Sequence, residues 1–197
     1  MTKFGLKRIS APKTWDINKK EMKFALRPFS GSSNFREGLT LCSILRDYLK
    51  FVNTMREAKF AINNKEILVN GRRKRNVHQI VGFMEIISFP ELKENFRISI
   101  DKKGKLRLIK ISEKESGLIP LKIKGITVIK KGQLQINLSS GKNILTKKKG
   151  LKPGDSLLIS IKNNKIEEHF KLEKGAFILL TGGKHIGEKG VIEKIEN

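Results

Sequence analysis

The chain has 197 residues and carries 42 Lys and Arg against 19 Asp and Glu, a formal net charge of +23, with only 7% aromatic residues. It contains no run of 18 apolar residues, which excludes a transmembrane helix, and a single cysteine, Cys42, which excludes an intramolecular disulfide and a zinc site built on several thiolates. A charge this large destabilises a compact chain by self-repulsion unless a polyanion neutralises it, so RNA or DNA is favoured as the partner over a membrane surface.

The positive charge is spread along the chain and is not confined to a tail. The net charge is +6 for residues 1–38, +7 for 39–105, +10 for 106–174 and zero for 175–197. A chain of this length can form one large or two to three small domains. Because its first residues lack the apolar core of a signal peptide, we expect a cytoplasmic protein.

Residues 1–38 mix Lys, Arg, Pro, Ser and Gly with isolated aromatic residues and show no sustained apolar period. This pattern predicts an extended basic arm that orders on RNA, because so few apolar residues cannot offset an ordering entropy of roughly 1–2 kcal/mol per residue. For Trp15, packing against the main body is favoured over stacking on a base. The arm cations expected to contact RNA are Lys7, Arg8, Lys13, Arg27 and Arg36.

The next segment predicts two amphipathic helices joined by a tight turn. Apolar residues recur at helical spacing from Leu41 to Leu49, and this first helix places Cys42 in the core. A second helix begins at Thr54, whose side chain can cap it while Glu57 reaches back, a T-x-x-E capping box. The cations of this helix pair that we expect to contact RNA are Arg46, Arg56 and Lys65.

The helix pair leads into a hairpin with a basic tip. Residues 67–69, I-L-V, predict a strand, and Asn70 and Gly71 supply the positive φ angles of a tight turn. A plain hairpin with a solvated charge run is the alternative to an RNA-binding turn. The basic cluster that follows the turn at once is Arg72, Arg73, Lys74 and Arg75.

The order of these elements resembles a known RNA-binding fold. The pattern resembles the S4-type αL fold: two helices are followed by I-L-V-N-G-R and then by residues 83–88, F-M-E-I-I-S. In ribosomal proteins, pseudouridine synthases and some synthetases, the helix pair and the following turn of this fold form one basic surface for structured RNA. The resemblance implies an αL domain over residues 39–95, with Asn70 and Gly71 part of its RNA-binding turn.

Motifs in the preceding arm narrow the resemblance to one family. The sequence reads L-K-R-x-x-A-P-K-x-W over residues 6–15, R-P-x-S-G over 27–31 and R-E at 36–37, directly before the αL pattern. Together these resemble the archaeal and eukaryotic small-subunit ribosomal proteins of the S-four-e family. The resemblance implies a structural protein that binds ribosomal RNA.

From Phe96 the apolar period changes to two, and Phe96 to Ile100, a turn at residues 101–104 and a strand from Leu106 predict a hairpin. Further short strands, the first opened by Pro120, are separated by frequent turns, which predicts a small barrel or curled sheet over residues 96–173. A lysine triplet in this region is either a phosphate contact or a solvated loop, and the +10 charge together with the family resemblance favours RNA. The triplet is Lys147, Lys148 and Lys149.

Residues 174–197 predict strand, glycine-rich loop and strand. The spacing fails a Walker loop, and the alternation of residues 191–195 lacks the helix that a dinucleotide fingerprint requires. T-G-G-K-H-x-G-x-x-G-x-I resembles the KOW motif of ribosomal proteins and NusG-like transcription factors, which implies an SH3-like barrel and a loop able to touch RNA. The barrel is either trimmed here or borrows strands from the central domain. The expected loop residues are Gly182, Gly183, Lys184, His185, Gly187 and Gly190.

The sequence contains no recognisable catalyst. The histidines His78, His169 and His185 are far apart and lack metal-ligand spacing, and no serine or cysteine lies in a nucleophile turn. We therefore expect no enzyme, cofactor, metal or small-molecule substrate. A pseudouridine synthase would need a large catalytic domain, for which the remaining strands are too short and too rich in lysine.

The sequence thus predicts an α+β fold in four regions: a basic arm (1–38), a helical αL domain (39–95), a central antiparallel β domain (96–173) and a KOW segment (174–197). We expect a structural constituent of the small ribosomal subunit, located in the cytoplasm, with ribosomal RNA and neighbouring ribosomal proteins as partners and no membrane contact. The alternative is a KOW-containing RNA-binding regulator of transcription or antitermination, and co-sedimentation with small subunits or with polymerase discriminates the two.

Overall fold

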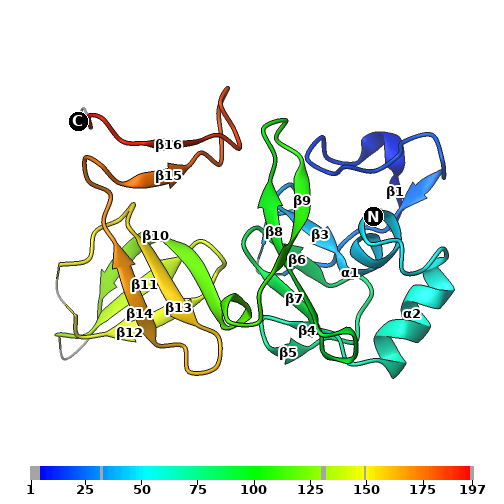
Figure 1. Cartoon of the computed structure of the whole chain (residues 1–197), viewed down its shortest axis with the longest axis horizontal. Helices are drawn as coiled ribbons and strands as arrows, with labels where there is room; N and C mark the ends of the chain where they lie inside the picture. Colours follow the sequence, from blue (N-terminus) through cyan, green and yellow to red (C-terminus); the bar gives the residue numbers. More distant parts are fainter. Residues whose placement is uncertain (1–4, 32, 130–131, 149, 196–197) are drawn as a thin grey trace. The chain divides into compact units, whose positions relative to one another are not determined.

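The computed structural model describes residues 5–31, 33–129, 132–148 and 150–195. The chain forms two compact units, Met1–Ser116 and Gly117–Asn197, drawn in Figure 1. Among the described residues no helix is both long and apolar enough to cross a membrane. Few helices and many antiparallel strands make up the two units, as predicted for an α+β fold.

The first unit contains short helices and three antiparallel sheets. Its helical segments are η1 (Arg8–Ser10), α1 (Leu41–Ser43), η2 (Ile44–Tyr48), α2 (Met55–Asn64), η3 (Pro90–Leu92) and η4 (Glu115–Gly117), the last of which ends at the first residue of the second unit. Its strands are β1 (Leu6–Lys7), β2 (Phe24–Ala25), β3 (Gly38–Thr40), β4 (Leu68–Val69), β5 (Arg72–Arg73), β6 (Ile80–Gly82), β7 (Ile86–Phe89), β8 (Glu94–Ile100) and β9 (Leu106–Ile111). The order of the five-stranded sheet is β5-β4-β7-β8-β9, and β1-β2 and β3-β6 form two-stranded sheets.

The predicted helix pair is present, and its caps follow the sequence signals. The Thr40 side chain accepts a hydrogen bond from the Ser43 N–H at the start of α1, which continues into the π-helical turn η2. At α2 the Glu57 N–H donates to Thr54 Oγ1 at 3.2 Å, and the Glu57 carboxylate accepts from the Thr54 N–H, so the capping box is confirmed. Hydrogen bonds from the Asn53 N–H and from Thr54 hold the pKa of Glu57 below its ordinary value.

The β8–β9 hairpin belongs to the first unit. Phe96 lies opposite Ile87 in the β7–β8 ladder, and Phe96, Ile98 and Leu106 join the same buried cluster as Leu39. The domain boundary expected between residues 95 and 96 therefore falls inside a sheet, and the units divide between Ser116 and Gly117. The alternation of β8 and β9 is confirmed, with the predicted turn at residues 101–104.

The N-terminal residues are folded onto the first unit, which corrects the expectation of an extended arm. Ala11, Trp15 and Ala25 are buried in the unit's core, and the exposed fraction of Trp15 is only 2%. The Leu106 N–H donates to Thr14 O at 2.7 Å, which ties the segment to β9. The packing role favoured for Trp15 is confirmed, as is the core position of Cys42, whose thiol pKa is raised by burial.

The second unit is built on one long bent strand. Its strands are β10 (Leu118–Val128), β11 (Leu134–Leu138), β12 (Asn143–Thr146), β13 (Ser156–Ser160), β14 (Ile166–Phe170), β15 (Phe177–Leu179) and β16 (Lys189–Val191). A register shift between Ile123 and Gly125 bends β10, so its first half pairs with β13 and its second half with β11. The resulting sheet has the order β12-β11-β10-β13-β14, and β10 begins two residues before Pro120. The strands predicted from Phe96 to be part of the same sheet lie in the first unit instead.

A buried carboxylate fixes the turn before β13. Asp155 accepts hydrogen bonds from the Lys152 and Leu172 N–H groups, both at 3.0 Å, and its Oδ2 lies 2.8 Å from His169 Nε2. Burial raises the pKa of Asp155, but the bonds from Leu172, His169 and Lys152 outweigh it and leave the pKa below its usual value. The ionised carboxylate is therefore more stable in the folded unit than in the unfolded chain.

We expect this carboxylate to make the second unit sensitive to acid. A lowered folded-state pKa contributes stability that is present above the unfolded pKa, near 3.9, and is lost as pH falls through the folded value. The variant Asp155→Asn should melt below wild type at pH 7, and the difference should narrow as pH is lowered from about 5 to 3. Thermal melting across this range tests the expectation, and a difference that stays constant with pH would contradict it.

Candidate nucleic-acid interface

The β4–β5 hairpin has the predicted tight turn. Val69 pairs with Arg72 across two residues, Asn70 (φ 50°) and Gly71 (φ 71°), whose positive φ angles define the twist-matched hairpin turn. Strand β5 lies at the edge of the five-stranded sheet, where Arg72 and Arg73 are exposed. Arg75 is exposed as well, while Lys74 is half-buried and its N–H donates to Ile67 O. The basic run is therefore presented at a sheet edge.

The Asn70 side chain braces the turn and is not free to contact RNA. Its Nδ2 donates to Glu85 Oε1 at 3.0 Å, and its Oδ1 accepts from the Ile86 N–H at 3.0 Å. The Glu85 carboxylate is buried and also accepts from the Gly82 N–H at 2.7 Å. The prediction of Asn70 as an RNA contact is corrected to a positioning role, because both of its polar side-chain atoms are used inside the protein.

The turn is coupled to the helix pair through Arg73. Its Nη2 donates to Asn63 O at 3.1 Å, in the last turn of α2, where backbone carbonyls carry partial negative charge. Lys65 is exposed just after the helix and lies 3.5 Å from Glu91. Arg56 is exposed at the opposite end of α2, roughly a helix length away, so it is not part of the turn cluster.

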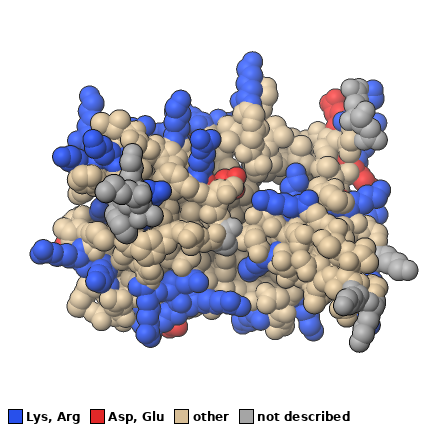
Figure 2. Space-filling model, turned by 180° about the vertical axis from the view of Figure 1, so that it is seen from behind, with Lys and Arg blue, Asp and Glu red and all other residues tan. Residues whose placement is uncertain are grey.

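The sequence stretch that forms this edge is rich in basic residues. The chain has no acidic residue between Glu66 and Glu85, the stretch that carries the four basic residues of the cluster. Lys and Arg also far exceed Asp and Glu on the face drawn in Figure 2. By sequence the first unit has 26 Lys and Arg against 12 Asp and Glu, and the second has 16 against 7. Each unit on its own can therefore attract a polyanion.

Two predicted RNA contacts are instead part of a buried ion cluster. The Arg8 side chain is 1% exposed, and its guanidinium donates to Asp47 Oδ1 at 2.7 Å and to Asn18 O at 2.8 Å. Arg46 is 10% exposed and bonds both oxygens of Asp47, at 3.2 and 2.9 Å. Burial lowers the pKa of Arg46, but Asp47 more than compensates and raises it. Arg8 and Arg46 therefore hold the N-terminal segment to the helix pair, and their guanidinium groups are used inside the protein.

The other cations predicted in the N-terminal segment lie at the surface. Lys7, Lys13, Arg27 and Arg36 are exposed. The same segment is also bound to the helix pair through the Asp16 N–H, which donates a hydrogen bond to the Tyr48 hydroxyl at 2.8 Å. The segment thus presents these four cations from a folded surface.

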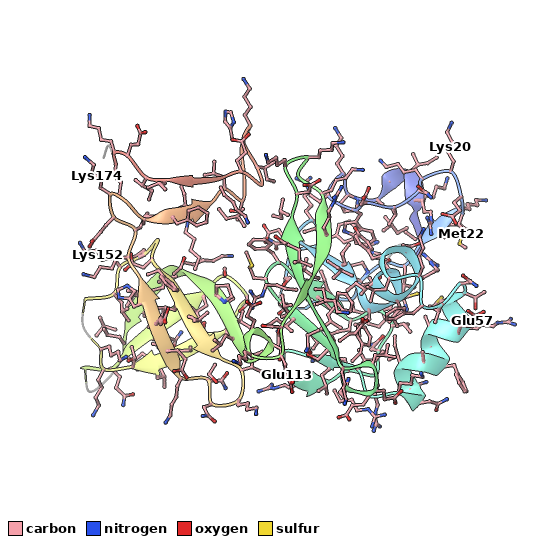
Figure 3. The ribbon with its side chains drawn as sticks, in the orientation of Figure 1. Lys20, Met22, Glu57, Glu113, Lys152 and Lys174 are labelled. Atoms are coloured by element: carbon pink, nitrogen blue, oxygen red, sulfur yellow. The ribbon has the colours of Figure 1, made fainter. Side chains whose placement is uncertain are left out.

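The second unit carries the remaining predicted contacts. Lys147 and Lys148 are exposed directly after β12, and Lys149 lies outside the described residues. Lys152 and Lys174, labelled in Figure 3, are exposed on the same unit. These lysines extend the positive surface of the second unit.

The glycine-rich loop joins β15 to β16 as predicted. Gly183 (φ 84°) and Gly187 (φ 81°) have positive φ angles, and the Gly187 N–H donates to Leu180 O at 2.7 Å. Gly182 and Lys184 are exposed, His185 Nδ1 lies 3.1 Å from Glu188 Oε2, and Gly190 lies within β16 opposite Ile178. Among the described residues β15 and β16 pair only with each other.

Within the part of the chain that the structure describes, no group of three or more His, Cys, Asp or Glu side chains is placed to hold a metal ion. The glutamates at 167 and 168 are both exposed on β14.

Comparison with known proteins gives consistent matches. The family model described as "Ribosomal family S4e" matches residues 92–166, and the RS4NT (NUC023) domain matches residues 2–32. The "Small ribosomal subunit protein eS4" of Methanosphaera stadtmanae is 43% identical over 191 residues, covering 97% of this chain and 79% of the relative. That of Methanocaldococcus jannaschii is 39% identical over 199 residues, covering 97% and 81%.

The chain belongs to the ribosomal S4e family. The crystal structure of the 30S ribosomal protein S4e from Thermoplasma acidophilum is also similar, with a TM-score of 0.73 and 32% identity over 82% of this chain and 83% of that one. The family predicted from the A-P-K-x-W and R-P-x-S-G motifs is confirmed.

Sequence reasoning missed two groups that shape this S4e surface. Asp47 forms ion pairs with Arg8 and Arg46, and Glu85 fixes the turn by accepting a hydrogen bond from Asn70. Asp47 lies 39 residues from Arg8 along the chain, so local patterns carry no signal for their pairing. Glu85 offered a weak signal, since it is an acid in an otherwise apolar stretch before β7.

Proposed function

We propose that this S4e-family chain is a structural constituent of the small ribosomal subunit that binds and stabilises folded ribosomal RNA. The observation that carries the proposal is the braced turn before β5, which exposes Arg72, Arg73 and Arg75 in a stretch without acidic residues. Its relatives, named as small ribosomal subunit proteins, support the same role. We place the protein in the ribosome, in the cytoplasm, with ribosomal RNA and neighbouring ribosomal proteins as partners and without catalytic activity.

The domain layout is part of the proposal. We assign residues 39–95 to an S4-type αL element, supported by the helix pair α1/η2 and α2 followed by the β4–β5 turn. Residues 174–197 form a KOW segment, supported by the strand, glycine-rich loop and strand of β15 and β16.

The mechanism follows from the shape of RNA helices. A-form RNA hides its base edges in a deep, narrow major groove, so contacts to phosphates and shape dominate its recognition. Arginine suits this task because its planar guanidinium can donate two hydrogen bonds to one phosphate. The basic cluster after the turn would bind phosphates along the backbone of one RNA helix, and the exposed lysines of the second unit would supply further phosphate contacts. The remaining cations of the proposed contact set are Lys7, Lys13, Arg27, Arg36, Arg56, Lys65, Lys147, Lys148 and Lys149.

The alternative of a transcription or antitermination regulator has no support among the relatives, which are named as ribosomal proteins. Sedimentation tests the choice. When the tagged chain is added to a lysate of its source cells and separated on a sucrose gradient, we expect it in the small-subunit fractions. Recovery with RNA polymerase and absence from the subunit fractions would overturn the proposal.

A further inference from the structure

Outside the basic cluster of residues 72–75, the first unit has a stacked pair of aromatic rings at its surface. The ring centroids of Phe29 and His78 are 4.4 Å apart, and their planes differ by 9°. The two segments that carry the rings are joined by main-chain contacts, since the Phe29 N–H donates to His78 O at 3.1 Å. The stack is therefore held by both backbone and side-chain interactions.

Hydrogen bonds fix the position of the His78 ring. His78 Nδ1 lies 2.7 Å from Arg27 O, and because a carbonyl oxygen can only accept, this nitrogen carries the proton. The His78 N–H donates to Asn76 Oδ1 at 2.9 Å, which orders the backbone under the ring. The histidine is a rigid support for Phe29.

The Phe29 ring is exposed to solvent. One face of Phe29 is covered by His78, and 54% of the side chain is nevertheless exposed. An aromatic side chain normally gains stability from burial, and this unit buries its only tryptophan. Phe29 instead offers a flat, preorganised apolar face at the surface.

The two segments that carry the rings contain basic residues and no acidic ones. The chain has no acidic residue between Glu21 and Glu37, nor between Glu66 and Glu85, the two stretches that carry the rings. Arg75 precedes His78 by three residues, so the Cα atoms of the two residues are at most about 11 Å apart. Exposed cations therefore lie close in sequence to both rings, which favours an anionic ligand for Phe29.

We propose that the outer face of Phe29 stacks an unpaired base of the bound RNA, while the neighbouring arginines contact phosphates of the same strand. This inference rests on the proposed function and adds a ligand class to it, a nucleotide splayed from a loop, bulge or helix end. Unpaired bases are the part of RNA that aromatic side chains recognise, and every base has a π face suited to such a ring. The paired helix and the splayed nucleotide would then be read by adjacent parts of one unit.

The test compares two exposed phenylalanines. Phe29→Ala should weaken binding to small-subunit ribosomal RNA by roughly 5- to 150-fold, the range expected for one base–aromatic stack. Phe170→Ala is the matched control, because Phe170 is similarly exposed, at 50%, but lies on β14 close to two glutamates. The Phe170→Ala variant should bind RNA with the affinity of wild type. Phe29→Trp should retain binding, because the larger ring still stacks. Ultraviolet cross-linking of RNA that contains 5-iodouracil should give an adduct on Phe29.

The readouts separate this inference from the RNA-binding proposal. Phe29 carries no charge, so the log-log salt slope of binding should be the same in Phe29→Ala and wild type. If wild type shows no RNA binding in these titrations, the proposed function itself fails. If wild type binds and the folded Phe29→Ala variant binds equally well with no adduct at the stack, the base-stacking inference is wrong. Loss of subunit association with unchanged RNA affinity would also overturn it, because the ring would then contact a protein.

Discussion

Replacing Asp47 by alanine should lower the unfolding free energy of the first unit by about 3–5 kcal/mol, the scale for removing one partner of a buried ion pair. The Asp47 side chain is 8% exposed and bonds two guanidinium groups, and the Arg8 side chain is only 1% exposed. Without the carboxylate, Arg8 would keep the Asn18 carbonyl and the more distant Glu21, at 3.8 Å, as the partners of a buried charge. Desolvation of that charge would no longer be offset.

Urea unfolding measures this effect, with two variants as references. Asp16→Ala removes an exposed ion pair to Lys105 in the same unit and should cost less than about 1 kcal/mol. The double variant Asp47→Ala with Arg8→Met should recover part of the loss, because the more deeply buried of the two guanidinium groups, that of Arg8, is removed together with its partner and only Arg46 is left without one. If Asp47→Ala were no less stable than Asp16→Ala, the ion cluster would not be what holds the N-terminal segment.

Local signals in the sequence predicted the local structure well. The T-x-x-E spacing at Thr54 placed a capping box, and the Asn70-Gly71 pair placed a turn with two positive φ angles. Both depend on residues within four positions of each other, so their geometry is encoded in short stretches. The alternation that begins at Phe96 likewise predicted β8 correctly.

The failures all involve contacts between distant residues. The N-terminal segment looked too poor in apolar residues to fold, yet Trp15 enters a core supplied by other elements, and Arg8 meets a carboxylate 39 residues away. The boundary after residue 95 followed a change of period from helix to strand. That change falls inside a sheet because β8 pairs with β7, a partner that periodicity does not reveal.

For the proposed interface, local pattern located the basic turn, but contacts across the sheet decide which side chains are free. Arg72 and Arg75 are exposed, whereas Asn70 is bound to Glu85 and Arg73 donates to the α2 carboxyl end. Arg72 and Arg75 are therefore the sharpest positions to test. Replacing them should leave the unfolding free energy within about 0.5 kcal/mol of wild type, as for other surface substitutions.

The double variant Arg72→Ala with Arg75→Ala should bind small-subunit ribosomal RNA more weakly and with a flatter salt dependence. Removing one cation from a phosphate should reduce the log-log slope by roughly 0.7–0.9, so removing both should reduce it by about 1.4–1.8. The matched control, Lys162→Ala with Lys165→Ala, removes the same charge from the exposed turn between β13 and β14 and should change the slope less. A variant with lysine at both arginine positions should keep the slope and bind less tightly, because it keeps the charge but not the planar fork.

The salt titration of this double variant against wild type tests the central claim most directly, with thermal melting to verify that the variant is folded. The proposed RNA-binding turn predicts a lower affinity and a slope smaller by about 1.4–1.8. A folded variant with the affinity and slope of wild type would contradict it, and the turn would then be an ordinary solvated hairpin tip.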